Sequence, residues 1–223
     1  MSNAASSPIR HAVVLAHPDP NSFNAMIARA YCDAVEAAGQ EVILRDLYAM
    51  TFDPVLKNEE RPVRKGVTLA PDVRAELDML RDTNVVTFVF PIWFGMPPAM
   101  LVGYIDRVLG AGTTVRQVQD RSAEGPLGKG HLCAITTSGA AADWLEAQGQ
   151  TEALRELAGT YLFRAFAMRS SEALHIGDVV EGASSAFIED SLQRVRKRAA
   201  SICARVGQEL YGTPLPPQLG DGS

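Results

Sequence analysis

The 223-residue sequence has only three cysteines, Cys32, Cys133 and Cys203, and they lie far apart. Neither a disulfide framework nor a zinc site has that spacing, because both need cysteines in pairs or clusters. We therefore expect no metal centre, and we expect a protein of the reducing cytoplasm.

The sequence also lacks a long apolar run and an excess of basic charge. No stretch reaches the roughly 18 consecutive apolar residues typical of a membrane-spanning helix, so no membrane insertion is expected. Asp and Glu number 26 against 21 Lys and Arg, the formal net charge is −5, and the basic residues are scattered. This charge balance argues against nucleic acid as a partner.

Apolar side chains are abundant: 47% of the residues are hydrophobic and 21% are charged, which suits one compact domain. We predict a single domain over residues 9–211. Residues 1–8 are expected to be a disordered N-terminus or the remnant of an expression tag, and they do not resemble a secretory signal. Residues 212–223 form a Pro-rich C-terminal tail that we also expect to be disordered, the alternative being a strap ordered on a neighbour.

Short apolar runs alternate with segments of helical periodicity. This pattern predicts strands at residues 12–16, 41–44, 85–90, 132–136 and 172–176, and helices between 23 and 39 and near 72–81, 98–109, 151–161 and 185–210. The run at 85–90 is apolar throughout, which is typical of a parallel strand buried on both faces. The alternation predicts a doubly wound α/β fold with five parallel strands and helices on both faces.

In such a sheet, ligands bind beyond the carboxyl ends of the strands, where three loops carry unusual residues. Residues 17–24 contain imidazole, hydroxyl and amide groups and lead into a helix whose free N–H groups suit phosphate; N-capping by Asn21 or Ser22 is the alternative. Residues 91–98 place two aromatic side chains where they can wall a planar ligand or fill the core. Residues 136–141 offer hydroxyls and small residues, suited to close ligand approach or to a flexible turn.

Competing motifs are incomplete. Residues 110–115 lack the third glycine of a dinucleotide-binding fingerprint and follow no strand, and residues 128–129 lack the rest of a P-loop. No Gly-x-Ser-x-Gly nucleophile elbow is present. Three histidines stand alone beside predicted strands and are expected to be structural: His11, His131 and His175.

Five groups of short segments are specific when taken together. They are Ala16-His17 with Ser22-Phe23-Asn24, Asp46-Leu47-Tyr48 with Phe52-Asp53-Pro54, Phe90-Pro91 with Trp93-Phe94-Gly95-Met96-Pro97, Gly103-Tyr104-Ile105-Asp106-Arg107-Val108, and Thr136-Thr137-Ser138-Gly139. With these segments the sequence resembles the NAD(P)H:quinone oxidoreductase family of flavodoxin-like flavoproteins, which includes the potassium-efflux ancillary oxidoreductases. The resemblance spans residues 10–139 and is vaguer as far as residue 177.

The resemblance implies a flavin site at the carboxyl edge of the sheet. Its phosphate or pyrophosphate would be held by His17, Ser22, Phe23 and Asn24, its isoalloxazine ring bordered by Pro91, Ile92, Trp93 and Phe94, and its pyrimidine edge lined by Thr136, Thr137, Ser138 and Gly139. Amides and hydroxyls suit that edge, because hydride arrival places negative charge near N1 and C2=O.

The sequence departs from the family after this last segment, where better-known quinone reductases carry a Tyr and a His. Trp144 lies near the Tyr position, and Gln150 or Thr151 lies near the His position. No proton relay is carried over, and the catalytic residue is left unassigned. Val102 also stands where the family usually has Lys.

The resulting prediction is a cytoplasmic flavoenzyme that takes a hydride from NADH or NADPH on flavin N5 and reduces a quinone or similar planar acceptor by a ping-pong mechanism. FAD is favoured over FMN, because residues 46–71 are long enough to cover an adenosine moiety and the spacing from His17 to Asn24 follows the FAD-binding members. The resemblance implies a homodimer. The alternatives are a flavodoxin-type electron carrier and a redox-sensing subunit of a membrane potassium-efflux transporter.

Overall fold

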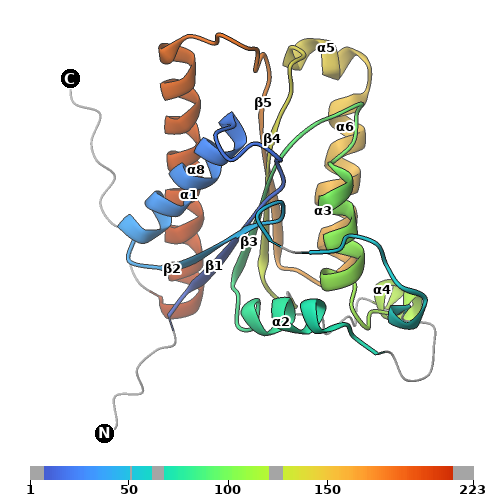
Figure 1. Ribbon diagram of the computed structural model, residues 1–223. Helices are drawn as coiled ribbons and strands as arrows, with labels where there is room; N and C mark the ends of the chain where they lie inside the picture. Colours follow the sequence, from blue (N-terminus) through green and yellow to red (C-terminus); the bar gives the residue numbers. More distant parts are fainter. Residues whose placement is uncertain (1–7, 51, 62–67, 121–127, 213–223) are drawn as a thin grey trace, which may run out of the picture.

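A parallel sheet of five strands lies between two helical layers (Figure 1). The computed structural model describes residues 8–50, 52–61, 68–120 and 128–212. In the order β2-β1-β3-β4-β5, the strands are β1 (Arg10–Leu15), β2 (Glu41–Asp46), β3 (Val85–Pro91), β4 (His131–Thr137) and β5 (Ser170–Ile176). The chain reverses its direction of winding at β1 and β3, so the loops after these strands diverge and leave room for a ligand.

The helical layers divide the core in two. One face of the sheet is covered by α1 (Phe23–Ala37) and α8 (Ser185–Tyr211). The other face carries α2 (Pro71–Met79), α3 (Ala99–Tyr104) with its π-helical continuation η2 (Ile105–Leu109), and α6 (Gln150–Leu154) with η3 (Arg155–Tyr161) and α7 (Leu162–Ala165). The shorter helices are η1 (Asn58–Glu60), α4 (Val115–Gln119) and α5 (Ala142–Ala147).

The strands bury apolar side chains on both faces. Val13 and Leu15 pack with α1 and α8, whereas Val14 and Phe88 pack on the opposite side with α3 and η2, because successive side chains of a strand alternate between faces. This confirms the doubly wound α/β fold and all five strands, each within two residues of its predicted bounds. The short helices α4 and α5 were not predicted, since five or six residues give too little periodicity.

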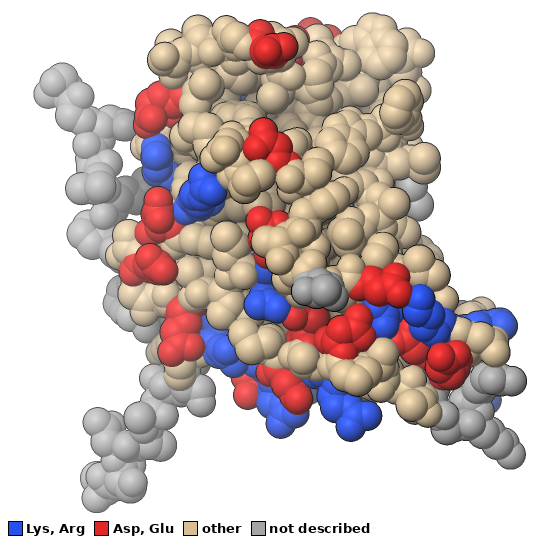
Figure 2. All heavy atoms as spheres, in the orientation of Figure 1, with Lys and Arg blue, Asp and Glu red and all other residues tan. Residues whose placement is uncertain are grey.

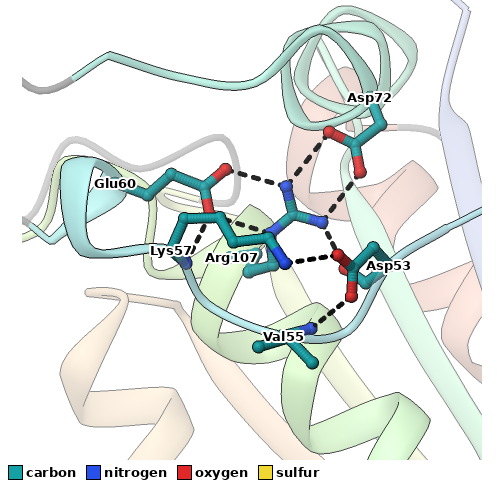
Figure 3. Close-up of polar contacts among 6 residues, drawn as sticks. All are labelled: Asp53, Val55, Lys57, Glu60, Asp72 and Arg107. Atoms are coloured by element: carbon teal, nitrogen blue, oxygen red, sulfur yellow. Dashed lines mark hydrogen bonds and ion pairs between the residues drawn. The ribbon is translucent and has the colours of Figure 1, made fainter.

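Arg107 anchors the long connection between β2 and α2 (Figure 3). Its guanidinium donates to both carboxylate oxygens of Glu60, at 2.9 and 2.8 Å, and to both oxygens of Asp72. It also donates to the backbone carbonyl of Asp53. The side chains of Arg107 and Glu60 are each 2% exposed. We refer to Arg107, Glu60 and Asp72 as the Arg107 cluster.

A close approach of Pro54 to Gly103 fixes the same connection. A β-carbon at Gly103 would lie 2.2 Å from the carbonyl oxygen of Pro54, so no side chain fits there. Phe52 also stacks under the guanidinium of Arg107, 5.1 Å from ring centre to Cζ. The segments 52–54 and 103–108, which carried the resemblance, are thus joined by packing and charge on the α3 side of the sheet.

Two further expectations concern membranes and metals. Within the described ranges, no helix is both long and apolar enough to cross a membrane, and no group of His, Cys, Asp or Glu side chains is placed to hold a metal ion. The cysteines are free, and burial raises the pKa of Cys32, Cys133 and Cys203 to about 12. Residues 1–7 and 213–223, most of the predicted terminal segments, lie outside the described residues.

Candidate functional site

The loops after β1, β3 and β4 meet at the carboxyl edge of the sheet, at the upper end in Figure 1. The backbone N–H of Ile92 donates to the carbonyl of Thr137 at 2.7 Å, which joins the second loop to the third. The rings of His17 and Trp93 lie 5.6 Å apart, which joins the first loop to the second. The three loops singled out in the sequence therefore form one continuous surface.

The first loop is braced by its own side chains. His17 Nδ1 accepts from the backbone N–H of Asp19 at 3.1 Å, so the other ring nitrogen remains for a ligand. Ser22 Oγ accepts from the backbone N–H of Ala25 at 3.2 Å and is the N-cap of α1. Ser22, rather than Asn21, thus performs the predicted capping.

The two residues after Ser22 turn their side chains inward. The buried Asn24 amide exchanges hydrogen bonds with Thr137 Oγ1 at 2.9 and 3.2 Å, which ties the first loop to the third. The Phe23 ring lies 6.2 Å from that of Phe187 on α8. Their side chains are thus occupied, but their backbone N–H groups begin α1 and have no acceptor within the described part of the chain.

The second loop is a tight turn in which Trp93 and Met96 exchange two backbone hydrogen bonds of 3.0 Å. The two central residues have positive φ, +51° at Phe94 and +78° at Gly95. Glycine adopts this conformation readily, whereas a phenylalanine there is strained. The Phe94 side chain is also fully exposed, and Trp93 is 40% exposed, while the preceding Pro91 is buried. An exposed aromatic in a strained turn favours a ligand-binding role over core filling.

In the third loop the hydroxyls are paired with neighbouring protein groups. Thr136 Oγ1 lies 2.9 Å from His175 Nδ1, and Ser138 Oγ lies 3.1 Å from His175 Nε2. Gly139 is exposed, and a β-carbon there would meet only the carbonyl oxygen of Val179, at 3.6 Å. The backbone N–H groups of residues 139–141 have no acceptor among the described residues. The loop therefore offers backbone donors beside an open glycine.

A cavity of about 110 Å³ lies between the sheet and the α6–η3 helix, below the third loop. Its walls are mostly apolar, with Phe90, Ile92 and Leu145 among them, and its polar side chains include Thr136 and His175. A larger cavity of about 650 Å³ lies at the opposite, amino edge and contains none of the predicted site residues. The residues of the three loops and the topology of the sheet both favour the carboxyl edge as the ligand site.

The residues at the altered family positions have distinct surroundings. Trp144 is 58% exposed on α5, and Thr151 lines the smaller cavity. Gln150 Nε2 donates to the carbonyl of Gly95 at 2.6 Å and so supports the second loop. His175 and Gln150 were missed as site residues. The alternation along 172–176 places His175 opposite Thr136 once the strands are paired, but nothing in the sequence indicates the Gln150 contact.

The arrangement fits a flavin. The start of α1 offers N–H groups and His17 to a phosphate, Trp93 and Phe94 offer aromatic surface to a ring, and the third loop offers N–H groups to its polar edge. In the space-filling view, charged side chains gather over the lower half and along the left side of the visible face, whereas its upper right part carries few (Figure 2). A weakly charged edge with backbone donors can bind a planar, partly anionic ligand.

Comparisons with known proteins find the same fold. The profile of the family described as "Flavodoxin-like fold" matches residues 10–199. A Haemophilus influenzae protein named "Uncharacterized NAD(P)H oxidoreductase" is 28% identical over 198 residues, covering 87% of this chain and 98% of its own. The rat enzyme "NAD(P)H dehydrogenase [quinone] 1" is 36% identical over 151 residues, covering 58% of this chain. The match spans only 54% of the rat enzyme's length.

Solved structures share the fold. The NAD(P)H:quinone oxidoreductase from Methanothermobacter marburgensis superposes with a TM-score of 0.74 at 21% identity, over 88% of this chain and 98% of its own. An FMN-dependent NADH-azoreductase from Bacillus anthracis, solved in complex with FMN, gives 0.62 at 15% identity, over 87% of this chain and 99% of its own. At these identities the likeness concerns the fold.

Proposed function

The chain belongs to the flavodoxin-like fold family, and within it we propose a flavin-dependent enzyme that uses NADH or NADPH to reduce a quinone or a similar planar acceptor. The observation that carries this proposal is the junction of three loops at one carboxyl edge. Asn24 and Ile92 both bond to Thr137, and the His17 ring lies beside that of Trp93, tilted to it. The names of the relatives, which describe oxidoreductases that use NAD(P)H and, in the rat enzyme, a quinone, support the same reaction class.

The start of α1 would bind the flavin phosphate. Backbone N–H groups of Phe23 and Asn24 point out of a helix N-terminus whose dipole favours negative charge. The ring of His17 lies beside them, held by Asp19. Ser22 contributes by capping the helix and so by keeping these donors in place.

The second and third loops would enclose the ring system. Trp93 and Phe94 supply aromatic contact, with Pro91 and Ile92 forming the floor behind them. In the third loop, Thr137 holds Asn24, and Gly139 permits close approach of the backbone. When bound, the flavin would supply the chemistry of accepting and passing on a hydride. The chain itself would orient the ring, exclude water from one side and offer N–H donors where negative charge develops.

FAD is our preferred cofactor, with FMN as the competing outcome. The spacing from His17 to Asn24 supports FAD, whereas a solved neighbour of this fold contains FMN. Residues 52–61 are held on the α3 side by the Arg107 cluster, so they do not cover the first loop. The rest of the connection that we expected to cover an adenosine includes residues 62–67, which lie outside the described residues.

We also propose a homodimer in the cytoplasm. Exposed apolar side chains follow β3 and β4 at the carboxyl edge: Phe94, Met96 and Trp144. Such a patch suits a protein interface. Three protonated, unpaired cysteines suit a reducing compartment. Light scattering at micromolar concentration would report the dimer, and a monomer would contradict it.

Steady-state kinetics test the reaction. NADH or NADPH oxidation is followed while the quinone concentration is varied, and the parallel double-reciprocal lines of a ping-pong mechanism are expected. Intersecting lines, which require both substrates bound together, would contradict the proposed mechanism. Acid extraction of the bound chromophore then identifies it, and recovery of FMN alone would overturn the preference for FAD.

A further inference from the structure

His175 contacts two hydroxyls of the third loop, although its sequence position indicated only a structural residue. It is paired with Thr136 in the β4–β5 register. Its Nδ1 lies 2.9 Å from Thr136 Oγ1, and its Nε2 lies 3.1 Å from Ser138 Oγ. Both nitrogens of one ring are therefore engaged by residues of the proposed flavin site.

The hydrogens in this group can be assigned. Ser138 Oγ donates its single hydrogen to the carbonyl of Ala140, at 2.8 Å, because a carbonyl can only accept. Ser138 Oγ must then accept from His175, which places the hydrogen of the neutral ring on Nε2. Nδ1 is consequently an acceptor, and Thr136 Oγ1 donates to it. The hydrogen bonds run in one direction, from Thr136 through His175 and Ser138 to Ala140.

The surroundings of His175 favour its neutral form. Burial and, second, the positive charge of Arg194 on α8 lower the pKa of His175 below its ordinary value. The Arg194 guanidinium donates to the His175 carbonyl at 3.4 Å. Arg155 on η3 lines the same cavity, and its charge is paired with Glu152 at 2.6 Å. Near neutral pH the ring is therefore uncharged.

We propose that neutral His175 is a positioning residue of the flavin site. It turns the hydroxyl hydrogens of Thr136 and Ser138 toward protein acceptors, so that the third loop presents backbone N–H groups rather than competing hydroxyl donors. Protonation would make Nδ1 a donor and reverse this hydrogen bond, so that Thr136 Oγ1 accepts. The hydroxyl hydrogen of Thr136, a residue that lines the 110 Å³ cavity, would then turn away from His175. This inference rests on the proposed function.

The other end of the same strand pair supplies a matched control. His131 on β4 is paired with Ser170 on β5, and its Nδ1 lies 2.9 Å from Ser170 Oγ. The contact resembles that of His175 with Thr136, but it lies at the amino edge, away from the three loops. His131→Gln therefore changes the same kind of contact without reaching the proposed site.

The test compares flavin affinity in wild type, His175→Leu, His175→Gln, Thr136→Val and His131→Gln. Dissociation constants for FMN and FAD are measured by flavin fluorescence from about pH 5 to about pH 8, with circular dichroism as the check on folding. His175→Leu is expected to weaken binding about three- to tenfold at neutral pH, as for the loss of one net hydrogen bond. Gln can both donate and accept, so His175→Gln should restore part of that loss, and His131→Gln should match wild type.

The pH dependence separates positioning from general packing. Wild-type affinity is divided by that of each variant at every pH, so that ionisation of the flavin phosphate cancels. The ratio of wild-type affinity to that of His175→Gln is expected to fall in acid, because His175 takes up a proton in wild type. The ratio of wild-type affinity to that of His131→Gln should stay constant. Thr136→Val removes the hydroxyl that donates to His175 Nδ1. Like His175→Gln, it should therefore lack the loss of flavin affinity that wild type shows in acid.

Each outcome is decisive. If His175→Leu binds flavin as wild type does, with the same pH profile, the positioning role is wrong while the proposed function stands. If wild type binds no flavin, the proposed function and the positioning role of His175 are both wrong. If His175→Leu does not fold, the test rests on His175→Gln and Thr136→Val. A loss of flavin affinity in acid that persists in both variants contradicts the proposal.

Discussion

The Arg107 cluster and the carboxyl edge of the sheet are built in opposite ways. In the cluster, the buried charge of Arg107 meets the carboxylates of Glu60 and Asp72, and its donors have acceptors (Figure 3). At the edge, backbone N–H groups have no acceptor within the described residues, and Phe94 is fully exposed in a strained conformation. Satisfied groups hold the fold, and groups left unsatisfied or strained mark the place for a ligand.

Removing the cation should give the largest effect on stability. Arg107→Ala leaves the buried Glu60 carboxylate without its cationic partner, and breaking a buried pair in this way costs about 3 to 5 kcal/mol. Urea denaturation of the flavin-free protein measures the change. Arg81→Ala, which removes an exposed ion pair with Asp78, is the control and should cost less than about 1 kcal/mol. Equal effects of the two substitutions would contradict the contrast between cluster and surface.

Acid should weaken the same cluster. Hydrogen bonds from Arg107 lower the pKa of Glu60 and of Asp72 below their ordinary values. A carboxyl whose folded pKa is lowered stabilises the fold above its unfolded pKa, about 4.3 for Glu and about 3.9 for Asp. That contribution is lost as the pH falls from this range through the folded pKa values. Denaturation at a series of pH values should show a steeper acid loss in wild type than in Arg107→Ala, and parallel curves would exclude the mechanism.

Gly103, beside the Arg107 cluster, and Gly139, at the carboxyl edge, should respond differently to substitution. At Gly103, a β-carbon would lie 2.2 Å from a backbone oxygen of Pro54, so Gly103→Ala should cost about 1 to 3 kcal/mol through overpacking. The control is Gly207→Ala in α8, where the nearest atoms are 3.8 Å away and alanine suits a helix better. Thermal denaturation should separate the pair, and an unchanged Gly103→Ala variant would show that residues 52–54 can move aside.

At the carboxyl edge, the corresponding substitution should affect ligand binding instead of stability. A β-carbon at Gly139 would meet only the carbonyl oxygen of Val179, at 3.6 Å, so we expect Gly139→Val to leave the domain folded. The added side chain would crowd the flavin, and about 1 to 3 kcal/mol of overpacking corresponds to at least a roughly fivefold loss of affinity. Fluorescence titration with FAD and FMN measures this loss. Undiminished affinity would show that the flavin does not lie against the third loop.

The smallest effect is expected at Phe94. Glycine adopts a φ of +51° without strain, so Phe94→Gly should stabilise the protein by about 0.5 to 1 kcal/mol while slowing quinone reduction. Melting temperature and turnover are measured on the same sample. A variant that is both less stable and equally active would mean that Phe94 serves packing and has no part in the site.

The sequence predicts some of this architecture because short-range patterns encode it. Apolar runs reveal the five strands, and topology then brings the loops at residues 17–24, 91–98 and 136–141 to one edge. Longer-range contacts leave no such pattern. Arg107 and Glu60 are 47 residues apart, and His175 reaches Thr136 only through the β4–β5 register. The strain at Phe94 likewise depends on a turn closed by Trp93 and Met96.

The most direct test of the account is a spectrophotometric titration of the purified protein with FAD and with FMN, followed by addition of NADH or NADPH. We expect one flavin bound per chain, with absorbance bands at about 375 nm and about 450 nm, the latter bleaching when the reduced nicotinamide is added. Failure to bind either flavin would contradict the central claim that the carboxyl edge of this sheet is a flavin site.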